Sequence, residues 1–121
     1  MIKGTITENM PLIQVLVAWG QAVQAPFVII DTGFTGDLQV TPEIANGLGL
    51  KVTGIMSVRI ANGQVVEIPT ALAIAVMEGA MNYVDVLISD SMPLIGIGFL
   101  SKFYYKTTID CKHMTVNLEK V

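Results

Sequence analysis

The sequence predicts an all-β fold, a mostly β, barrel-like domain with one or two short helices. Short apolar runs separated by turn residues recur along the chain, and such runs are typical of strands. The pair Asn62-Gly63 stands between two alternating segments, which is a strong signal for a β-hairpin. Only one stretch carries clear helix start and stop signals, so helix is expected to be a minor component.

The first part of the chain is predicted to hold strands and one helix. The expected strands cover residues 4–7, 12–17, 27–30 and 37–40. Residues 27–30 form a continuous apolar run, which predicts a strand buried on both faces. Thr41 can cap a helix, Pro42 suits its first position, and Glu43 favours the positive end of the helix dipole. Gly49 is a natural stop for this helix.

The second part of the chain continues with strands. A hairpin is expected from residues 57–60 and 65–68, with its turn at 61–64. Further strands are expected at residues 70–77, 83–88 and 94–95, with a turn at 90–93. A short second helix is expected at residues 98–104, and a closing hairpin at residues 107–110 and 114–118.

Composition predicts one ordered domain that spans residues 1–121. Hydrophobic residues make up 52% of the chain and charged residues only 14%, which excludes general disorder. The mean hydropathy of +0.62 is high for a soluble monomer. A small chain this apolar is expected to cover part of its surface with a partner, most simply a second copy of itself.

Charge and cysteine content exclude several classes. The net charge is −3 and the seven basic residues are scattered, so a nucleic-acid partner is not expected. The single cysteine, Cys111, excludes an internal disulfide and a zinc site built from cysteines. Residues 9–30 carry no charge, but their Gln and Pro residues argue against a membrane-spanning helix. No signal peptide is evident, and the expected location is cytoplasmic.

Asp31-Thr32-Gly33 is the strongest candidate for chemistry. Its carboxylate directly follows aliphatic residues at the end of an expected strand, and a buried carboxylate is costly unless it is hydrogen-bonded or paired. Thr32 adds a hydroxyl, and Gly33 allows close approach to the backbone. The same triplet is also ordinary turn composition, so a structural β-barrel in which Asp31 is a turn residue stays open.

Two signatures resemble a known family. Residues 28–38 resemble the active-site strand and loop of the retropepsin-like (clan AA) aspartic proteases, above all the small prokaryotic members; they read Val-Ile-Ile-Asp-Thr-Gly-Phe-Thr-Gly-Asp-Leu. Residues 94–100, Leu-Ile-Gly-Ile-Gly-Phe-Leu, resemble the second signature of that family. The Asn62-Gly63 hairpin lies between them, where the family carries its substrate-covering flap. The resemblance implies the acid protease fold, with one lobe per chain.

The resemblance also implies a mechanism. Aspartic proteases use two carboxylates on one water, and this chain has a single Asp-Thr-Gly, so the resemblance implies a homodimer that cleaves a peptide or protein substrate. The two carboxylates would share one proton, because two like charges in close contact cannot both ionise easily. One Asp31 would be the general base and the other would donate a proton to the scissile carbonyl. No metal and no cofactor is implied.

The other roles are likewise implied by the resemblance. Thr32 would hydrogen-bond across the dimer, and Gly33 would admit water and substrate. The residues expected to bind substrate are Gly36, Ala61, Asn62 and Gly63, the last three at or near the flap tip. Those expected to pack behind the catalytic loop are Leu94, Ile95 and Gly96.

Other features favour an alternative, a catalytically silent barrel that binds peptides or partners. Gly98 stands where many relatives have a polar residue, so a buttressing contact to the catalytic loop is expected to be missing. The flap is less glycine-rich than in viral enzymes.

Asp37 and Asp85 have no obvious partner, and Asp85 is expected to face solvent. His113 is interpreted as a residue of a solvated turn and not as a metal ligand.

Overall fold

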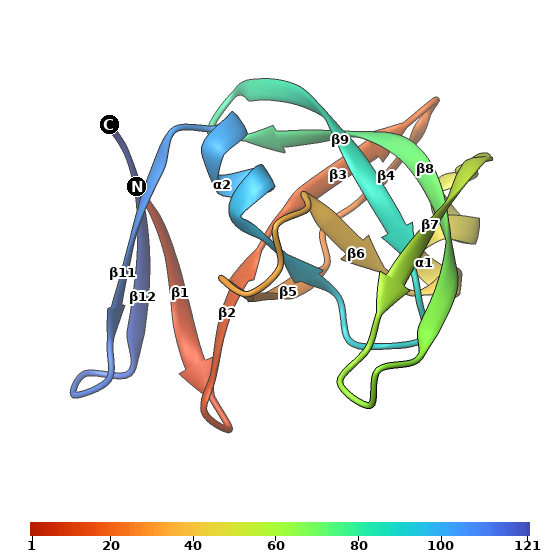
Figure 1. The fold of residues 1–121 in the computed structure, drawn as a ribbon. Helices are drawn as coiled ribbons and strands as arrows, with labels where there is room; N and C mark the ends of the chain where they lie inside the picture. Colours follow the sequence, from red (N-terminus) through yellow and green to blue (C-terminus); the bar gives the residue numbers. More distant parts are fainter.

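The computed structural model describes all 121 residues, and its strands form one extensive mixed sheet (Figure 1). The strands are β1 (Ile2–Thr7), β2 (Met10–Gln14), β3 (Leu16–Trp19), β4 (Ala22–Gln24), β5 (Phe27–Ile30), β6 (Leu38–Val40), β7 (Val52–Arg59), β8 (Val65–Met77), β9 (Ala80–Ile88), β10 (Leu94–Ile95), β11 (Tyr105–Asp110) and β12 (Thr115–Lys120). The helices are α1 (Pro42–Leu48) and α2 (Ile97–Lys102).

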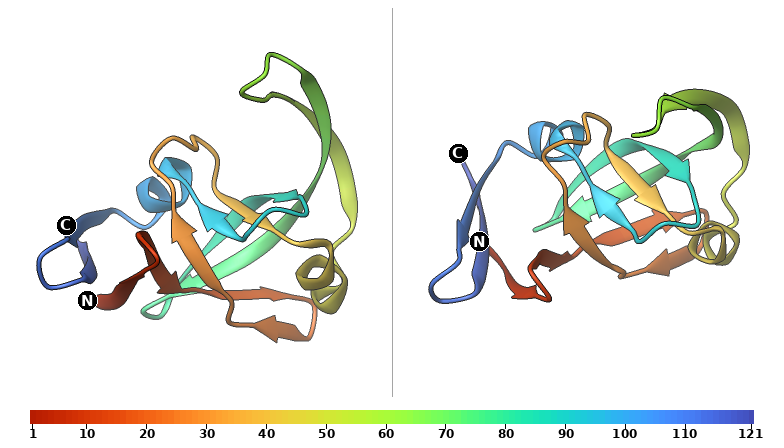
Figure 2. Two further views of the ribbon diagram at one scale, coloured as in Figure 1. Left: turned by 90° about the horizontal axis from the view of Figure 1, so that it is seen from below. Right: turned by 60° about the horizontal axis from the view of Figure 1, so that its bottom comes forward.

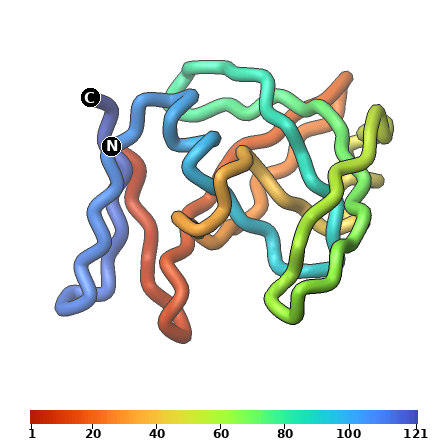
Figure 3. The backbone as a smooth tube through the Cα atoms, in the orientation of Figure 1, coloured from red at the N-terminus to blue at the C-terminus, as the bar shows by residue number.

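The hydrogen-bonded order of the strands is β11-β12-β1-β2-β5-β10-β6-β9-β8-β3-β4, and β7 pairs with β8 alone. Two pairs are parallel, β10 with β5 and β6 with β9, and the others are antiparallel. Because β1 pairs with β12, both ends of the chain lie side by side in one sheet (Figure 3). The long hairpin of β7 and β8 stands out from the body of the molecule (Figure 2).

The core is largely aliphatic and takes side chains from the central strands, from α2 and from the C-terminal strand β12. Its fully buried side chains include Val28, Leu38 and Val86 from the central strands and Leu118 from β12. Phe99 of α2 also lies fully buried, with its ring centroid 5.0 Å from that of Phe103. Helix α2 therefore joins the central strands to the terminal sheet. The predicted all-β fold with two short helices is confirmed.

The helix signals were interpreted correctly. The Thr41 hydroxyl accepts a hydrogen bond from the Ile44 N–H at 3.3 Å, and Gly49 ends α1 in the left-handed conformation with φ of 68°. Helix α2 begins at Ile97 and ends at Lys102, before the predicted residue 104. The left-handed φ of 56° at Tyr104 explains this early end.

Strand boundaries differ from the prediction where a strand changes partner. The expected strand 12–17 divides at Val15, because β2 pairs with β1 and β5 whereas β3 pairs with β4 and β8. Strand β4 was not predicted. In contrast, β8 runs unbroken through Pro69, where two strands were expected.

The expectation that residues 27–30 are buried on both faces is wrong for the single chain. Val28 and Ile30 are buried, but Ile29 is half-buried and Phe27 is 65% exposed. Strand β5 therefore presents one face to the core and leaves the other partly open.

No helix is both long and apolar enough to cross a membrane.

Candidate active site

The loop from Asp31 to Asp37 connects β5 to β6 and carries the Asp-Thr-Gly triplet. Asp31 is half-buried, and its backbone N–H donates to the Ile95 carbonyl at 2.9 Å. The Gly33 N–H donates to Oδ1 of Asp31 at 2.9 Å, and the Phe34 N–H donates to the Asp31 carbonyl at 3.1 Å. Oδ2 accepts no hydrogen bond from the protein. The loop therefore fixes the carboxylate by one oxygen and leaves the other for an external partner.

The second signature lies directly against this loop. Strand β10 sits between β5 and β6, with Leu94 opposite Ile29 and Ile95 opposite Ile30. The first N–H groups of α2 and of the residue before it point at the loop. They donate from Gly96 to the Asp37 carbonyl at 3.1 Å, from Ile97 to Phe34 at 2.9 Å and from Gly98 to Gly36 at 3.1 Å. The structure thus brings Leu94, Ile95 and Gly96 together with the triplet.

Gly98 owes its identity to this contact. A Cβ there would stand 2.9 Å from the carbonyl oxygens of Thr35 and Gly36 and would also meet the Asp37 carboxylate. Gly36 similarly leaves room for the Phe34 ring, which a Cβ would meet at 2.5 Å. A polar side chain at position 98 has no space in this chain.

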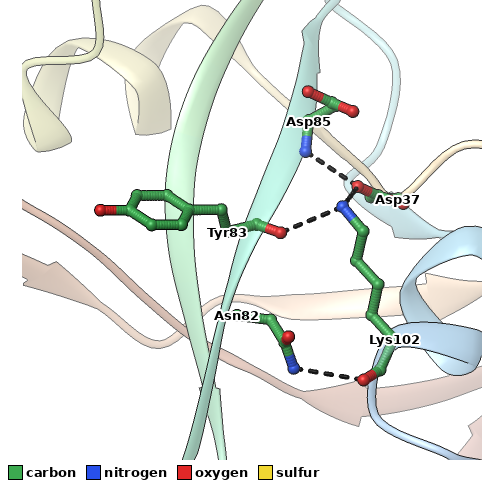
Figure 4. Close-up of polar contacts among 5 residues, drawn as sticks. All are labelled: Asp37, Asn82, Tyr83, Asp85 and Lys102. Atoms are coloured by element: carbon green, nitrogen blue, oxygen red, sulfur yellow. Dashed lines mark hydrogen bonds and ion pairs between the residues drawn. The ribbon is translucent and has the colours of Figure 1, made fainter.

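The buttress that was expected to be missing is instead an ion pair (Figure 4). Asp37 is buried, and its Oδ2 accepts from Lys102 Nζ at 2.6 Å and from the Asp85 N–H at 2.9 Å. Lys102 also donates to the Tyr83 carbonyl at 3.0 Å, and Asn82 donates to the Lys102 carbonyl at 3.2 Å. The expectation that Asp37 lacks a partner is wrong, because its partner lies 65 residues away in α2. Asp85 itself is exposed, as predicted.

Two hollows flank the loop. The first, of about 260 Å³, lies between the loop and the base of the β7–β8 hairpin; it is lined by residues 34–37, Met56, Thr70 and residues 85–87. The second, of about 660 Å³, lies between α2 and β11; it is lined by Thr32, Ile97, Leu100, Ser101, Tyr104, Tyr105, Thr107 and Val121. The loop thus faces one hollow with Gly36 and the other with Thr32.

The predicted flap residues are not in contact with the triplet. Ala61, Asn62 and Gly63 are exposed at the tip of the β7–β8 hairpin, which stands clear of the body in the left view of Figure 2. Their hydrogen bonds are local, such as Gln64 N–H to Asn62 Oδ1 at 2.9 Å and Gly63 N–H to the Ile60 carbonyl at 2.9 Å. Gly63 has a φ of 85°, so the turn needs glycine there.

Two titratable groups with shifted pKa values, Tyr105 and Asp110, lie on β11. The His113 N–H, the His113 ring and the Lys112 N–H donate to Asp110 and hold the pKa of its carboxyl below the usual value. Burial, together with the hydrogen bond to Glu78, raises the pKa of Tyr105. His113 is exposed in its turn, as expected, and no group of three His, Cys, Asp or Glu side chains is placed to hold a metal.

No model of a known protein family matches the sequence, and no curated protein matches it significantly. The solved structures that resemble the chain include two proteases. The EIAV protease, solved with the inhibitor HBY-793, aligns with a TM-score of 0.62 and 19% identity over 78% of this chain and 88% of that one. A retropepsin-like aspartic protease from Rickettsia conorii aligns with a TM-score of 0.64 and 17% identity over 98% of this chain and 89% of that one. The chain has the retropepsin-like fold.

This result confirms the fold that the two signatures predicted. In the retropepsin-like fold of this chain, the signatures are joined by main-chain hydrogen bonds between the triplet loop and the start of α2. Sequence reasoning missed Asp37 and Lys102 as part of the site. The only available signal was a carboxylate directly before a buried strand, since such a group needs a partner.

Proposed function

We propose that the protein is an aspartic endopeptidase that acts as a homodimer, with one Asp31 from each chain. The proposal rests mainly on the hydrogen bonding of Asp31. Its backbone and Oδ1 are held by hydrogen bonds within the chain, whereas Oδ2 accepts none. A carboxylate fixed in this way can orient a water, which is the task of a general base.

The proposed reaction needs both carboxylates and one shared proton. The unprotonated Asp31 takes a proton from water as the water oxygen attacks the scissile carbonyl carbon, and the protonated Asp31 of the partner subunit gives its proton to the carbonyl oxygen. As the C–N bond of the resulting diol breaks, the first Asp31 gives its proton to the leaving nitrogen. The second Asp31 takes a proton from a diol hydroxyl, so that a carboxylic acid and an amine are released and the pair again holds one proton. Thr32, which is exposed beside Asp31, would hydrogen-bond across the dimer, and Gly33 would leave room for the water.

The proposed substrate is an extended peptide that lies between the triplet loop and the β7–β8 hairpin. The hollow of about 260 Å³ between them offers space for a side chain beside Gly36. The hairpin tip with Ala61, Asn62 and Gly63 would close over the peptide, which binds as an added strand. Leu94, Ile95 and Gly96 would support the loop from behind. The single domain and the cytoplasmic location stay predictions.

The deciding experiment is Asp31→Asn, assayed on a peptide library at several pH values. The amide keeps the shape and the hydrogen bond from Gly33 but is no base, so turnover should fall at least about 100-fold with an unchanged melting temperature. Asp90→Asn, at an exposed turn residue, is the matched control and should cleave like the wild type. Cleavage by Asp31→Asn at the wild-type rate would refute the proposal. Tight binding of a pepstatin-type inhibitor without any turnover in the wild type would favour the silent peptide-binding alternative.

A further inference from the structure

Asp85 is an exposed carboxylate that has no partner within the chain. Its backbone N–H donates to Asp37, but its side chain accepts no hydrogen bond and forms no ion pair, and it points away from the Lys102 ammonium (Figure 4). Asp37 differs, because Lys102 compensates its charge at 2.6 Å. Both carboxylates belong to the lining of the hollow of about 260 Å³ beside the triplet loop. Of the two, Asp85 alone carries a charge that the fold does not balance.

The register of the sheet directs the Asp85 side chain toward this hollow. Side chains two residues apart on a strand share a face, and so do residues directly opposite each other on neighbouring strands. Asp85 therefore shares a face of β9 with Leu87, which stands opposite Thr70 of β8. Leu87 and Thr70 line the hollow together with Met56 of β7. The hollow thus lies between this sheet face and the triplet loop, with the Asp85 carboxylate on its wall.

The rest of the lining has no positive charge and much apolar surface. Phe34, Met56, Val86 and Leu87 supply the apolar surface, and no Lys, Arg or His belongs to the lining. A lysine or arginine side chain matches this composition, because its aliphatic stem packs against apolar groups while its head carries a positive charge. An acidic side chain would instead bring a second negative charge near Asp85. Charge complementarity therefore favours a basic side chain as the occupant of the hollow.

We propose that this hollow binds a lysine or arginine side chain of the peptide substrate and that Asp85 determines this specificity. The inference rests on the proposed function, which places an extended peptide between the triplet loop and the β7–β8 hairpin. Phe34 lines the hollow, and its N–H donates to the Asp31 carbonyl at 3.1 Å, so a peptide bound at Asp31 passes the hollow. Asp85 contacts a substrate side chain and takes no part in bond cleavage. It therefore selects which peptides are cleaved.

Cleavage of matched peptides by Asp85→Asn tests this specificity. A position-scanning peptide library first locates the position at which the wild type prefers a basic residue, and two peptides then carry lysine or norleucine there. Norleucine keeps the aliphatic stem of lysine but lacks the ammonium, so the ratio of kcat/KM for the two peptides reports the contribution of the charge. The wild type should favour the lysine peptide at least about fivefold, and Asp85→Asn should cleave both peptides about equally.

Asp90→Asn is the matched control, because it removes one carboxylate from an exposed turn outside the hollow. Its ratio should equal that of the wild type, which separates a local contact from the loss of overall negative charge. Asp85→Lys gives a second readout, since it should reverse the preference so that a glutamate peptide is cleaved faster than the lysine peptide. An unchanged ratio in Asp85→Asn, or a wild type that prefers a basic residue at no position, would overturn the proposal.

Binding measured without turnover separates this inference from the proposed function. The same library is screened for binding to the Asp31→Asn chain by fluorescence anisotropy, and adding Asp85→Asn should abolish the preference for lysine over norleucine. If the wild type cleaves nothing but this preference is found, the proposed function is refuted and the specificity of the hollow stands. Cleavage without a basic preference refutes the specificity and leaves the function standing. A chain that neither binds nor cleaves any peptide of the library refutes both.

Discussion

The buried carboxylate of Asp37 ties the loop that carries Asp31 to helix α2. The carboxylate accepts from Lys102 at the end of α2 and from the Asp85 N–H on β9, and the Asp37 backbone carbonyl accepts from the Gly96 N–H. Because Asp37 is the last residue of the triplet loop, the ion pair with Lys102 holds this end of the loop against α2. The ion pair thus acts on position, and the Asp31 carboxylate itself performs the proposed chemistry.

Lys102→Met should therefore lower the free energy of unfolding. It leaves a carboxylate that is 8% exposed with the Asp85 N–H as its one remaining partner, and an unpaired buried group of this kind costs about 1–3 kcal/mol. Urea unfolding measures the effect. Lys51→Met, at an exposed position, should change stability by less than about 0.5 kcal/mol. Adding Asp37→Asn to Lys102→Met should restore part of the loss, and equal stability of the two lysine variants would contradict the role of the pair.

The site residues that could be predicted from the sequence are those that stand next to one another in a short motif. Asp31-Thr32-Gly33 and Leu94-Ile95-Gly96 could be found in this way, and the structure brings them into contact. The Asp37–Lys102 pair could not, because its members are 65 residues apart and no local pattern marks them. For the same reason Gly98 suggested a lost contact, although it is the close approach of the loop that requires a glycine.

Among the elements, apolar runs and turn residues located most strands, but their pairing came from the tertiary structure. Val15 lies in an apolar run that gives no sign of a break, yet the chain leaves β5 there to join β8. Strand β4 has three residues, too few for a periodic pattern. The β7–β8 hairpin was marked by Asn62-Gly63, but its length depends on pairing that continues past Pro69.

The tip of this hairpin should exchange its amide hydrogens faster than the central strands. Strand β7 has a neighbour on one side only, whereas β5 is hydrogen-bonded to β2 and β10. The bonds of the tip are local, and its residues are exposed. Hydrogen exchange followed by mass spectrometry on the unliganded protein should show peptides from residues 57–66 at least about tenfold faster than those from residues 27–30. Equal protection of the two segments would argue against a hairpin that opens and closes over substrate.

At the scale of the whole molecule, the high mean hydropathy is reflected in apolar side chains that the single chain leaves exposed. Several large apolar side chains of the single chain are exposed, and they lie in more than one part of the fold; Phe27, Ile55, Met81 and Tyr104 are each at least 65% exposed. Only those around α2 and β11 adjoin a hollow that reaches the triplet. The composition therefore predicted that a partner covers apolar surface, and the fold indicates which surface borders the site.

A shared site makes the Asp31→Asn chain an inhibitor of the wild type. If each site takes one Asp31 from each protomer, every mixed dimer lacks one carboxylate and should not cleave. With random exchange, an equal amount of Asp31→Asn should reduce the cleavage by a fixed amount of wild type to roughly half, and a ninefold excess to roughly a tenth. Peptide cleavage measured after the two proteins have been incubated together gives this titration.

The control for this titration is Asp90→Asn, an exposed turn variant that keeps its Asp31. Adding it to the wild type should increase the cleavage in proportion to its amount. If Asp31→Asn leaves the rate per wild-type chain unchanged at every ratio while the proteins exchange subunits, each chain carries a complete site of its own, and the shared-carboxylate mechanism is wrong.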